Sequence, residues 1–377
     1  MSQIAFAMLY LRSIWKKVYP RQAMTSEPKM ERLRVMMKPY QGSDHSVFGV
    51  LLERGETSTI AEGTTDAAIP AGERIFEIGS ITKVFTAILL YQLAEDGRVD
   101  PCRPLNELSD ALADVPRWIT PERLISHTSG LPNLYIPLWK ALLSPHLEGP
   151  YAEFNRRDLI DWFHRRQGKS RERKVRHAYS NLGVGLLGEA LAMRELTPFA
   201  ELLAKKVIRP LGLTDTTHSL DNSQRARFAP PKSPDGQAVS PWTFRALAAT
   251  GCLKSSASDL ARFSDGVLKA LQNPMSPLDR AICKSTEPIL GLGKRGALKP
   301  VAQCAGWLSY TKSKSDLRIL HASGGTAGST CALYICPEKS AAIAILSNNG
   351  VAASLWGSLK LSRSDQLSQA MQIFHML

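Results

Sequence analysis

The chain has 377 residues, of which 44% are hydrophobic and 21% charged, with 26 Gly and 23 Pro. This is the composition of a folded protein, because a disordered chain carries too little apolar surface to offset the entropy of ordering. No stretch approaches the roughly 18 consecutive apolar residues that span a bilayer, which excludes a transmembrane protein. The net charge of +13 favours anionic partners such as carboxylates or carrier-bound acyl groups. The basic residues are scattered without a nucleic-acid-binding signature, so we expect no nucleic-acid partner.

Residues 1–40 precede the first predicted strand. A short apolar run at 4–11 is followed, rather than preceded, by Arg12, Lys16 and Lys17, and the first acidic residue is Glu27. A secretory signal has the opposite order of charges, so we expect none. The segment is compatible with a basic organellar leader or a helix at a membrane surface. An N-terminal helix packed on the body is the interpretation we favour.

The cysteines are few and form no C-x-x-C pair, which predicts neither a zinc site nor a disulfide framework. We expect free, buried thiols in a reducing compartment and therefore a cytoplasmic protein. The six are Cys102, Cys252, Cys283, Cys304, Cys331 and Cys336.

The first elements form a pattern of strand, turn and buried helix. Runs at 47–52 and 57–62 predict a β-hairpin, and 74–78 predicts a further extended segment. Gly79 and Ser80 come next, followed by an apolar series at 84–93 that is dense enough for a buried helix ending at Gly97. Ser80 is therefore expected at the start of a helix that enters the core.

The middle of the chain is helical, and strand signals return only late. Thr120 followed by Pro121 predicts a helix start. Further helices are expected at 157–166, 182–194, 198–208, 256–271 and 354–374, and strands at 305–310, 317–321, 330–336 and 341–346. Strands at both ends do not alternate with helices as in a doubly wound parallel sheet. The pattern predicts an α+β fold, an antiparallel β-sheet flanked by helices plus an inserted helical lobe.

We expect the body of this fold to be a catalytic domain at 41–350. Its sheet would come from 43–100 and 245–350, and the helical lobe from 101–244. Residues 351–377 would form a C-terminal helix packed on the sheet.

Ser80 and Lys83 form a Ser-x-x-Lys motif. On a helix these positions lie about one turn apart on one face, so the amine can reach the hydroxyl. Desolvation would lower the pKa of the lysine and let it take the serine proton. The helix N-terminus would add N–H groups where an oxyanion forms. The chain contains three other Ser-x-x-Lys sequences, but none of them opens a long apolar helix after a strand and turn.

Two further segments carry candidate chemistry. Tyr179 directly precedes Ser180, Asn181 and a predicted helix, so its phenol could share proton transfer with Lys83, although a helix cap and a core aromatic would give the same pattern. The glycine-rich stretch at 321–328 could be an edge strand that donates an N–H to an oxyanion, or a hairpin turn. His127 fits a loop-ordering residue better than a general base. No nucleophile elbow, Walker loop, dinucleotide fingerprint or zinc-protease motif is present, so we expect neither cofactor nor metal.

Taken in order, these segments resemble the serine β-lactamase and penicillin-binding-protein superfamily, specifically its class C β-lactamase-like branch. The resemblance spans roughly 47–348. It rests on Phe76-Glu-Ile-Gly-Ser-Ile-Thr-Lys83, Leu124-Ile-Ser-His-Thr-Ser-Gly-Leu-Pro132, Tyr179-Ser-Asn-Leu-Gly183, Pro210-Leu-Gly-Leu-Thr-Asp215, residues 251–263 and the Gly324–Gly328 loop. It implies an antiparallel sheet flanked by helices plus a helical lobe, as the pattern of elements does.

The resemblance also implies roles for individual residues. Ser80 resembles the acylated nucleophile, Lys83 its base, and Tyr179 the base that activates the deacylating water or acceptor. Asn181 would touch the substrate or Lys83. The backbone N–H groups of Ser80 and Gly325 would form the oxyanion site. The remaining substrate contacts would come from Ser323, Gly324, Gly325 and Thr326.

The third motif departs from the family. Members usually carry Lys or His four residues before the Thr that matches Thr326, but Ala322 stands there and His321 lies one residue early. A one-residue shift on a strand sends a side chain to the opposite face. We therefore expect a serine hydrolase or acyltransferase that works through a Ser80 acyl-enzyme, most simply a cytosolic esterase or biosynthetic acyltransferase. The alternatives are a β-lactamase or D-amino-acid peptidase, and a catalytically silent scaffold with the same fold.

Overall fold

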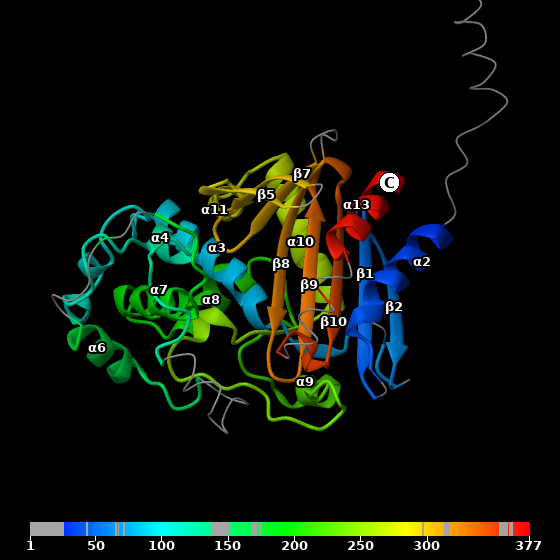
Figure 1. Cartoon of the computed structure of the whole chain (residues 1–377), viewed down its shortest axis with the longest axis horizontal. Coiled ribbons are helices and arrows are strands. Elements are labelled where there is room, and N and C mark those ends of the chain that lie inside the picture. The colour runs from blue at the N-terminus through cyan, green and yellow to red at the C-terminus, as the bar shows by residue number, and fades with distance from the viewer. Residues whose placement is uncertain are drawn as a thin grey trace, which may run out of the picture.

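A computed structural model describes residues 26–377, except 43, 65, 67, 71, 137–150, 167–171, 173–174, 296–297, 313–316, 354–360 and 362–364. Its centre is an antiparallel sheet in the order β2-β1-β10-β9-β8-β7-β6-β5 (Figure 1). The strands are β1 (Ser46–Glu53), β2 (Glu56–Gly63), β5 (Leu290–Arg295), β6 (Leu298–Gln303), β7 (Leu308–Lys312), β8 (Arg318–Gly325), β9 (Thr330–Cys336) and β10 (Ala341–Ser347). A small second sheet pairs β3 (Ile75–Glu77) with β4 (Lys254–Ser256).

The two ends of the chain meet in the large sheet. β1 turns into β2 through Arg54 and Gly55, both with positive φ (52° and 89°), a turn whose twist suits a hairpin. β1 also pairs with β10, with Val47 opposite Ser347. The predicted hairpin and the predicted sharing of one antiparallel sheet by N- and C-terminal strands are confirmed.

Both faces of the sheet are covered, which explains the continuous hydrophobic runs of its central strands. All seven residues of β10 are buried. Ala342, Ala344 and Leu346 enter one core, while Ala341, Ile343 and Ile345 enter the other. This alternation is the two-residue period of a strand seen from both sides.

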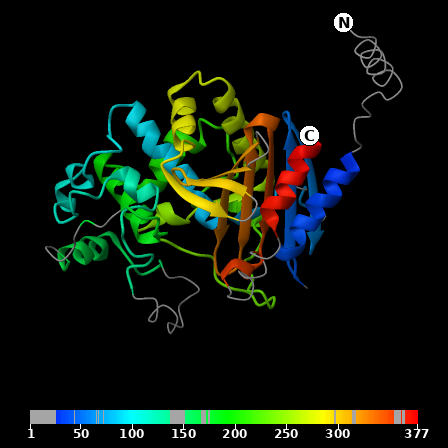
Figure 2. The ribbon, with the colours of Figure 1, turned by 45° about the horizontal axis from the view of Figure 1, so that its top comes forward.

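Helices form the two covering layers and the lobe. On one face, α2 (Ser26–Met37) and α13 (Gln366–Met376) lie side by side (Figure 2). On the other face, α10 (Ala257–Gln272) packs against β1 and β10, α11 (Pro277–Ser285) packs against α10 and α3, and α3 (Thr82–Glu95) lies on the side of the lobe. The lobe contains α4 (Pro121–Ile125), α6 (Arg156–His164), α7 (Asn181–Arg194) and α8 (Phe199–Leu203), the last continued by a π-helical turn at Ala204–Ile208; α9 (Asn222–Arg227) follows.

Helix α3 is the central element of the larger core. It is apolar on every side, and all its residues from Thr82 to Leu93 are buried. Such a helix is stable only inside the protein. Gly79 begins the turn before it with φ of 46°, a conformation that favours glycine. The turn delivers Ser80 to the surface end of a rigid, buried helix.

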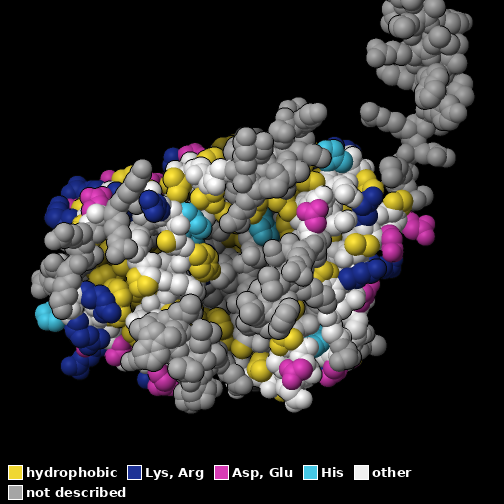
Figure 3. All heavy atoms as spheres, viewed as in Figure 1, with side chains coloured by type: hydrophobic (Ala, Val, Ile, Leu, Met, Phe, Trp, Pro, Cys, Tyr) yellow, Lys and Arg dark blue, Asp and Glu magenta, His cyan; other side chains and the backbone are white. Residues whose placement is uncertain are grey.

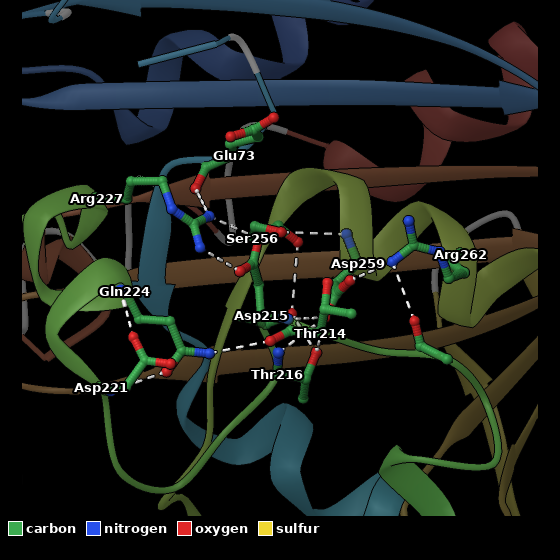
Figure 4. A network of polar contacts seen from close by, with 12 residues as sticks. Glu73, Thr214, Asp215, Thr216, Asp221, Gln224, Arg227, Ser256, Asp259 and Arg262 are labelled. Carbon is green, nitrogen blue, oxygen red and sulfur yellow. Dashed lines mark hydrogen bonds and ion pairs between the residues drawn. The ribbon is translucent and has the colours of Figure 1, made fainter. Parts of the chain in front are cut away.

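The last segment of the lobe is fastened to α10 by buried polar contacts (Figure 4). The Asp259 carboxylate accepts hydrogen bonds from the backbone N–H groups of Asp215 and Thr216, at 2.7 and 2.8 Å, and from Arg262 at 2.6 Å. Arg227 binds both carboxylate oxygens of Asp215, at 2.6 and 2.8 Å. Buried carboxylates paired in this way fix one chain path. The Pro210–Asp215 motif is therefore a structural junction.

Several predicted elements differ from the structure. β4, β5, β6, α9 and α11 were not predicted, and β7 begins at Leu308 rather than at residue 305. The glycine-rich stretch is part strand and part hairpin turn: β8 continues through Gly325, and Thr326 to Gly328 lie in the turn that leads to β9, where the Thr326 N–H donates to the Ser329 carbonyl at 2.9 Å. Nor is β8 an edge strand, since it lies between β9 and β7; β7 pairs only with 318–321 and leaves 322–325 unpaired on that side.

The termini and cysteines bear on the remaining expectations. α2 packs on the sheet, while residues 1–25, to which the leader hypothesis applies, lie outside the described residues. α13 forms the described part of the C-terminal helix and also packs on the sheet. The six cysteines are free thiols, and four of them are buried. Within the described residues, no helix has the length and apolarity to cross a membrane.

Candidate active site

Three predicted side chains meet at the N-terminal end of α3. The Lys83 ammonium nitrogen lies 2.8 Å from Ser80 Oγ, and the Tyr179 hydroxyl lies 2.7 Å from the same oxygen. Lys83 Nζ also donates to the Thr250 carbonyl at 2.6 Å and sits 5.1 Å from the centre of the Tyr179 ring. Segments that are distant in sequence thus bring a hydroxyl, an amine and a phenol into one crevice.

The environment of Lys83 favours its neutral form. The side chain is 2% exposed, and burial lowers its pKa, while the neighbouring Tyr179 opposes that shift. The Thr250 carbonyl holds one N–H of the amine. Lys83 Nζ donates to Ser80 Oγ at 2.8 Å; after losing a proton, which its lowered pKa favours, the amine can accept the hydroxyl proton over the same distance as a general base.

Tyr179 lies on an extended segment that ends at the cap of α7. Ser180 is that cap, since its side chain accepts from the backbone N–H of Gly183. The Tyr179 ring packs against His127, with ring centres 4.4 Å apart, yet the tyrosine remains 42% exposed. It is thus not the core aromatic that the sequence also allowed. Its hydroxyl faces Ser80, and both residues line the crevice.

His127 orders the segment that carries Tyr179. Its carbonyl accepts from the Ala178 N–H at 2.8 Å, and its Nδ1 accepts from the Ser180 N–H at 3.2 Å. Burial lowers the pKa of His127 to about 3, and the nearby Lys83 contributes to this shift. A neutral imidazole whose Nδ1 is occupied holds a loop, as the sequence suggested, and is a poor general base.

The third motif passes close to the nucleophile through glycines. A Cβ built on Gly324 would lie 1.9 Å from the Ile78 carbonyl oxygen and 3.0 Å from the Ser80 nitrogen. A Cβ on Gly79 would lie 2.8 Å from the Gly325 nitrogen. The two backbones therefore approach as closely as side-chain-free residues allow. The backbone N–H groups of Ser80 and Gly325 lie where these two segments come closest to each other.

Glu77 was missed by sequence reasoning and fastens the third motif to the nucleophile strand. It is 3% exposed, accepts from the Thr326 hydroxyl at 2.6 Å and from the Trp242 N–H at 2.7 Å. Burial raises the pKa of Glu77. The Thr326 hydroxyl is therefore engaged by Glu77 rather than free for a ligand. An acidic residue three positions before the serine was the only signal in the sequence.

The remaining predicted site residues occupy different places. Ser323 is exposed and lines the crevice together with Ser80. The side chain of Asn181 is hydrogen-bonded to that of Tyr151, whereas the Lys83 amine bonds to Ser80 and Thr250. Ala322 packs in the core on the α3 side of the sheet, whereas His321 stacks on Tyr334 in the direction of α13. The expectation that His321 faces away from the position of Ala322 is confirmed.

The crevice offers room for a small acyl substrate. Beside Ser80 it opens into a cavity of about 590 Å³, lined by Tyr179, Trp242 and the β8 residues 323–325 among others. In Figure 3, hydrophobic and histidine side chains gather around a hollow between the lobe and the sheet. Among the described residues, no three His, Cys, Asp or Glu side chains are arranged as metal ligands.

Comparison with known proteins identifies the family. The family model named Beta-lactamase matches residues 59–358, which is most of the chain. The chain belongs to the beta-lactamase family. The D-alanyl-D-alanine-carboxypeptidase/endopeptidase AmpH of Escherichia coli (strain K12) is 25% identical over 294 residues, covering 72% of this chain and 70% of the relative. A beta-lactamase of Providencia stuartii is 29% identical over 201 residues, covering 52% and 47% of the two chains.

Solved structures of this family share the fold. The class C beta-lactamase of Rhodobacter sphaeroides superimposes with a TM-score of 0.71 at 18% identity, covering 91% of this chain and 99% of the other. A beta-lactamase/D-alanine carboxypeptidase of Pseudomonas syringae gives the same TM-score at 21% identity, covering 90% and 97%. The predicted superfamily and the predicted α+β fold are both confirmed. The chain is a β-lactamase-like serine hydrolase by family.

Proposed function

We propose that this protein is a serine acyl hydrolase of the D-amino-acid peptidase type, which also reacts with β-lactams, and that Ser80 carries the acyl group. The observation that supports this most strongly is the convergence of Lys83 and Tyr179 on Ser80 Oγ at 2.8 and 2.7 Å. The relatives include proteins named as β-lactamases, penicillin-binding proteins and carboxypeptidases. They favour our second expectation over the esterase or acyltransferase we placed first.

The proposed acylation follows from the geometry. Ser80 Oγ attacks the substrate carbonyl while its proton passes to the neutral amine of Lys83. The carbonyl oxygen becomes an oxyanion held by the N–H groups of Ser80 and Gly325. Tyr179, hydrogen-bonded to the same Oγ, then donates its hydroxyl proton to the leaving group. The products of this step are an ester on Ser80 and the free leaving amine or thiol.

Deacylation uses the same groups in reverse. Tyr179, now lacking its proton, takes one from a water molecule that attacks the Ser80 ester. The oxyanion returns to the same N–H pair, and Lys83 gives the proton back to Ser80 Oγ as the acid departs. An amine or alcohol in place of water would make the same chain an acyltransferase.

One observation keeps an esterase as a second candidate. At the position of Ala322, β8 has no cationic side chain beside the crevice. A substrate without a carboxylate therefore forgoes no ion pair at that position. Esters with neutral leaving groups are substrates of this kind.

Steady-state hydrolysis separates these functions. The wild type and Ser80→Ala would be compared on an acyl-D-alanyl-D-alanine peptide, a chromogenic cephalosporin and a nitrophenyl ester. We expect Ser80-dependent release of D-alanine. Turnover of the nitrophenyl ester alone would move the assignment to esterase, and no Ser80-dependent reaction with any of the three would indicate a silent scaffold.

A further inference from the structure

A second cavity adjoins the crevice through Trp242. It measures about 380 Å³, which is within the range of small-molecule binding sites. Trp242 is the one described residue that lines both cavities, whereas Ser80, Lys83 and Tyr179 do not line this one. The second cavity is therefore separate from the place where the acyl chemistry occurs.

Two cations line the second cavity. Arg225 belongs to α9 and Lys254 to β4. The Arg225 Nε–H donates to the Leu220 carbonyl at 3.1 Å, and the Lys254 ammonium donates to the His218 carbonyl at 3.1 Å. Each of these bonds uses a single N–H, whereas arginine has five and lysine three. Both side chains are therefore held in place and keep donors for another acceptor.

Among the described residues, no acid is paired with these cations. None of those that line the cavity is Asp or Glu, and neither Arg225 nor Lys254 forms an ion pair with a described carboxylate. Burial raises the pKa of Glu77, and the charge of Lys254 opposes this rise. The two oxygens of Glu77 are nevertheless bound by the Thr326 hydroxyl and the Trp242 N–H. Positive groups without a paired acid attract an anion.

Arg225 is carried by a helix whose position is fixed (Figure 4). Asp221 and Gln224 form a capping box at the start of α9, with the Asp221 carboxylate accepting from the Gln224 N–H at 2.8 Å and the Gln224 side chain accepting from the Asp221 N–H at 3.0 Å. Gln224 Nε2 also donates to the Thr214 carbonyl at 3.0 Å. These bonds tie α9 to the junction at Pro210–Asp215. The backbone that carries Arg225 is thus positioned without a ligand.

Three aromatic side chains also line the cavity, namely Phe228, Trp242 and Phe244. Two of them pack on Tyr151. The Phe244 ring stacks on it with ring centres 5.0 Å apart, and the Trp242 ring meets it edge-on at 5.3 Å. Tyr151 is 3% exposed, so a buried ring holds both of these side chains in place. Ordered aromatic rings favour a planar aromatic ligand, through offset-stacked or edge-to-face contacts.

We propose that the second cavity binds a small molecule other than the acyl substrate, namely an anion with a planar aromatic body. Its anionic group binds the remaining N–H groups of Arg225 and Lys254, and its aromatic body packs against the three rings. The bound molecule contacts Trp242, whose backbone N–H donates to Glu77, and the same carboxylate accepts from Thr326. The ligand therefore lies against the segment that anchors the third motif. Such binding is independent of the proposed function.

Binding of two matched probes to the full chain tests this. Naphthalene-2-sulfonate and naphthalene-2-sulfonamide differ in the charge of one group, because the sulfonamide is neutral at pH 7. By isothermal titration calorimetry we expect the sulfonate to bind at least about tenfold more tightly, the discrimination that a charge-assisted hydrogen bond provides. Protein whose Ser80 has been blocked by a fluorophosphonate should bind the sulfonate with the same dissociation constant. Binding that disappears after this block would place the probe in the catalytic crevice and overturn the inference.

The double variant Arg225→Gln/Lys254→Gln should bring the two dissociation constants within about threefold of each other, because the charge-assisted contacts are lost. Lys205→Gln/Arg209→Gln is the matched control, since it removes two positive charges from exposed residues that do not line the cavity, and it should retain the preference. Arg225→Gln alone, at an exposed position, should weaken the preference even if the double variant does not fold. Equal binding or no binding of the two probes by the wild type, or an undiminished preference in folded Arg225→Gln, would also overturn the inference. If Ser80 does not label, the proposed function fails, while these variants still decide whether the cavity binds an anion.

Discussion

Substituting Gly324 by alanine tests whether the close approach of β8 to the nucleophile matters for catalysis. The added methyl group would lie 1.9 Å from the Ile78 carbonyl oxygen, about 1.1 Å short of the 3.0 Å that real Cβ contacts essentially never fall below. The φ of Gly324 is not in the left-handed region, so the effect is purely steric. β8 must therefore move by about an ångström away from the turn that holds Ser80.

A displacement of that size should cost reactivity far more than stability. Misplacing a reacting or stabilising group by about 1 Å can lower a rate by about 100-fold, and loss of one oxyanion donor costs about 100- to 1,000-fold. We expect Gly324→Ala to slow fluorophosphonate labelling of Ser80 by at least about 100-fold. The pairing of Gly324 with Cys331 on β9 should keep the strand in the sheet, so the fold persists.

The assay is the second-order rate constant for Ser80 labelling, measured by intact mass beside a circular dichroism melt. Gly291→Ala is the matched control, because a Cβ at that position in β5 meets nothing within 4 Å. A folded Gly324→Ala protein that labels at the wild-type rate would refute the role of β8 in the oxyanion site.

Four other predictions concern side chains of the site. The labelling rate should rise with pH, because the neutral amine of Lys83 is the base. Burial lowers the pKa of Lys83, so the midpoint of this rise should lie below the pKa of an ordinary lysine, near 10.4. Lys83→Arg should abolish labelling at every pH. Tyr179→Phe should reduce turnover about 100- to 10,000-fold with an unchanged melting temperature, since the ring is 42% exposed; normal turnover would exclude its proton-transfer role. Glu77→Leu leaves the Thr326 hydroxyl and the Trp242 N–H without their acceptor. The unfolding free energy measured by guanidinium titration should therefore fall by about 2–6 kcal/mol. Glu77→Gln keeps an acceptor oxygen and should lower the unfolding free energy by less. The folded pKa of His127, about 3, lies below its unfolded value near 6.5, so the unfolded state binds the proton first and stability falls as pH decreases. This histidine should contribute a loss of about 2 kcal/mol between pH 7 and 5, and the loss should be absent in His127→Asn.

The parts of the fold that follow strong local patterns were predictable. The apolar series after Ser80 predicted α3 because a helix buried on all sides needs apolar residues throughout. The hydrophobic runs of β9 and β10 predicted strands, and they are continuous because both faces of these strands are buried. The strands β5 and β6 were missed because Gly, Lys and Pro interrupt their alternation, and register shifts near Gly291 and Gly293 break it further.

Candidate residues were predictable where backbone context selected them. The strand and tight turn singled out Ser80 and Lys83 among four Ser-x-x-Lys sequences. Glu77 was not predictable, since its significance lies in its contact with Thr326, which is 249 residues away in sequence. The commitment of the Thr326 hydroxyl to Glu77 was invisible for the same reason.

The glycine-rich stretch shows where pattern and tertiary structure conflict. Glycines at 324 and 325 read as a turn by propensity alone. In the structure they are strand residues, and Gly324 is required because the Ile78 carbonyl occupies the space of a side chain. Close contact between segments, rather than local conformation, explains this sequence.

The most direct test of the account is to locate the acyl group after reaction with benzylpenicillin. Rapid acid quenching, protease digestion and tandem mass spectrometry would assign any adduct to a residue. The account predicts a penicilloyl group on the Ser80 hydroxyl, lost in Ser80→Ala and strongly reduced in Lys83→Arg. An adduct on another residue, or an adduct of equal yield in Ser80→Ala, would contradict it.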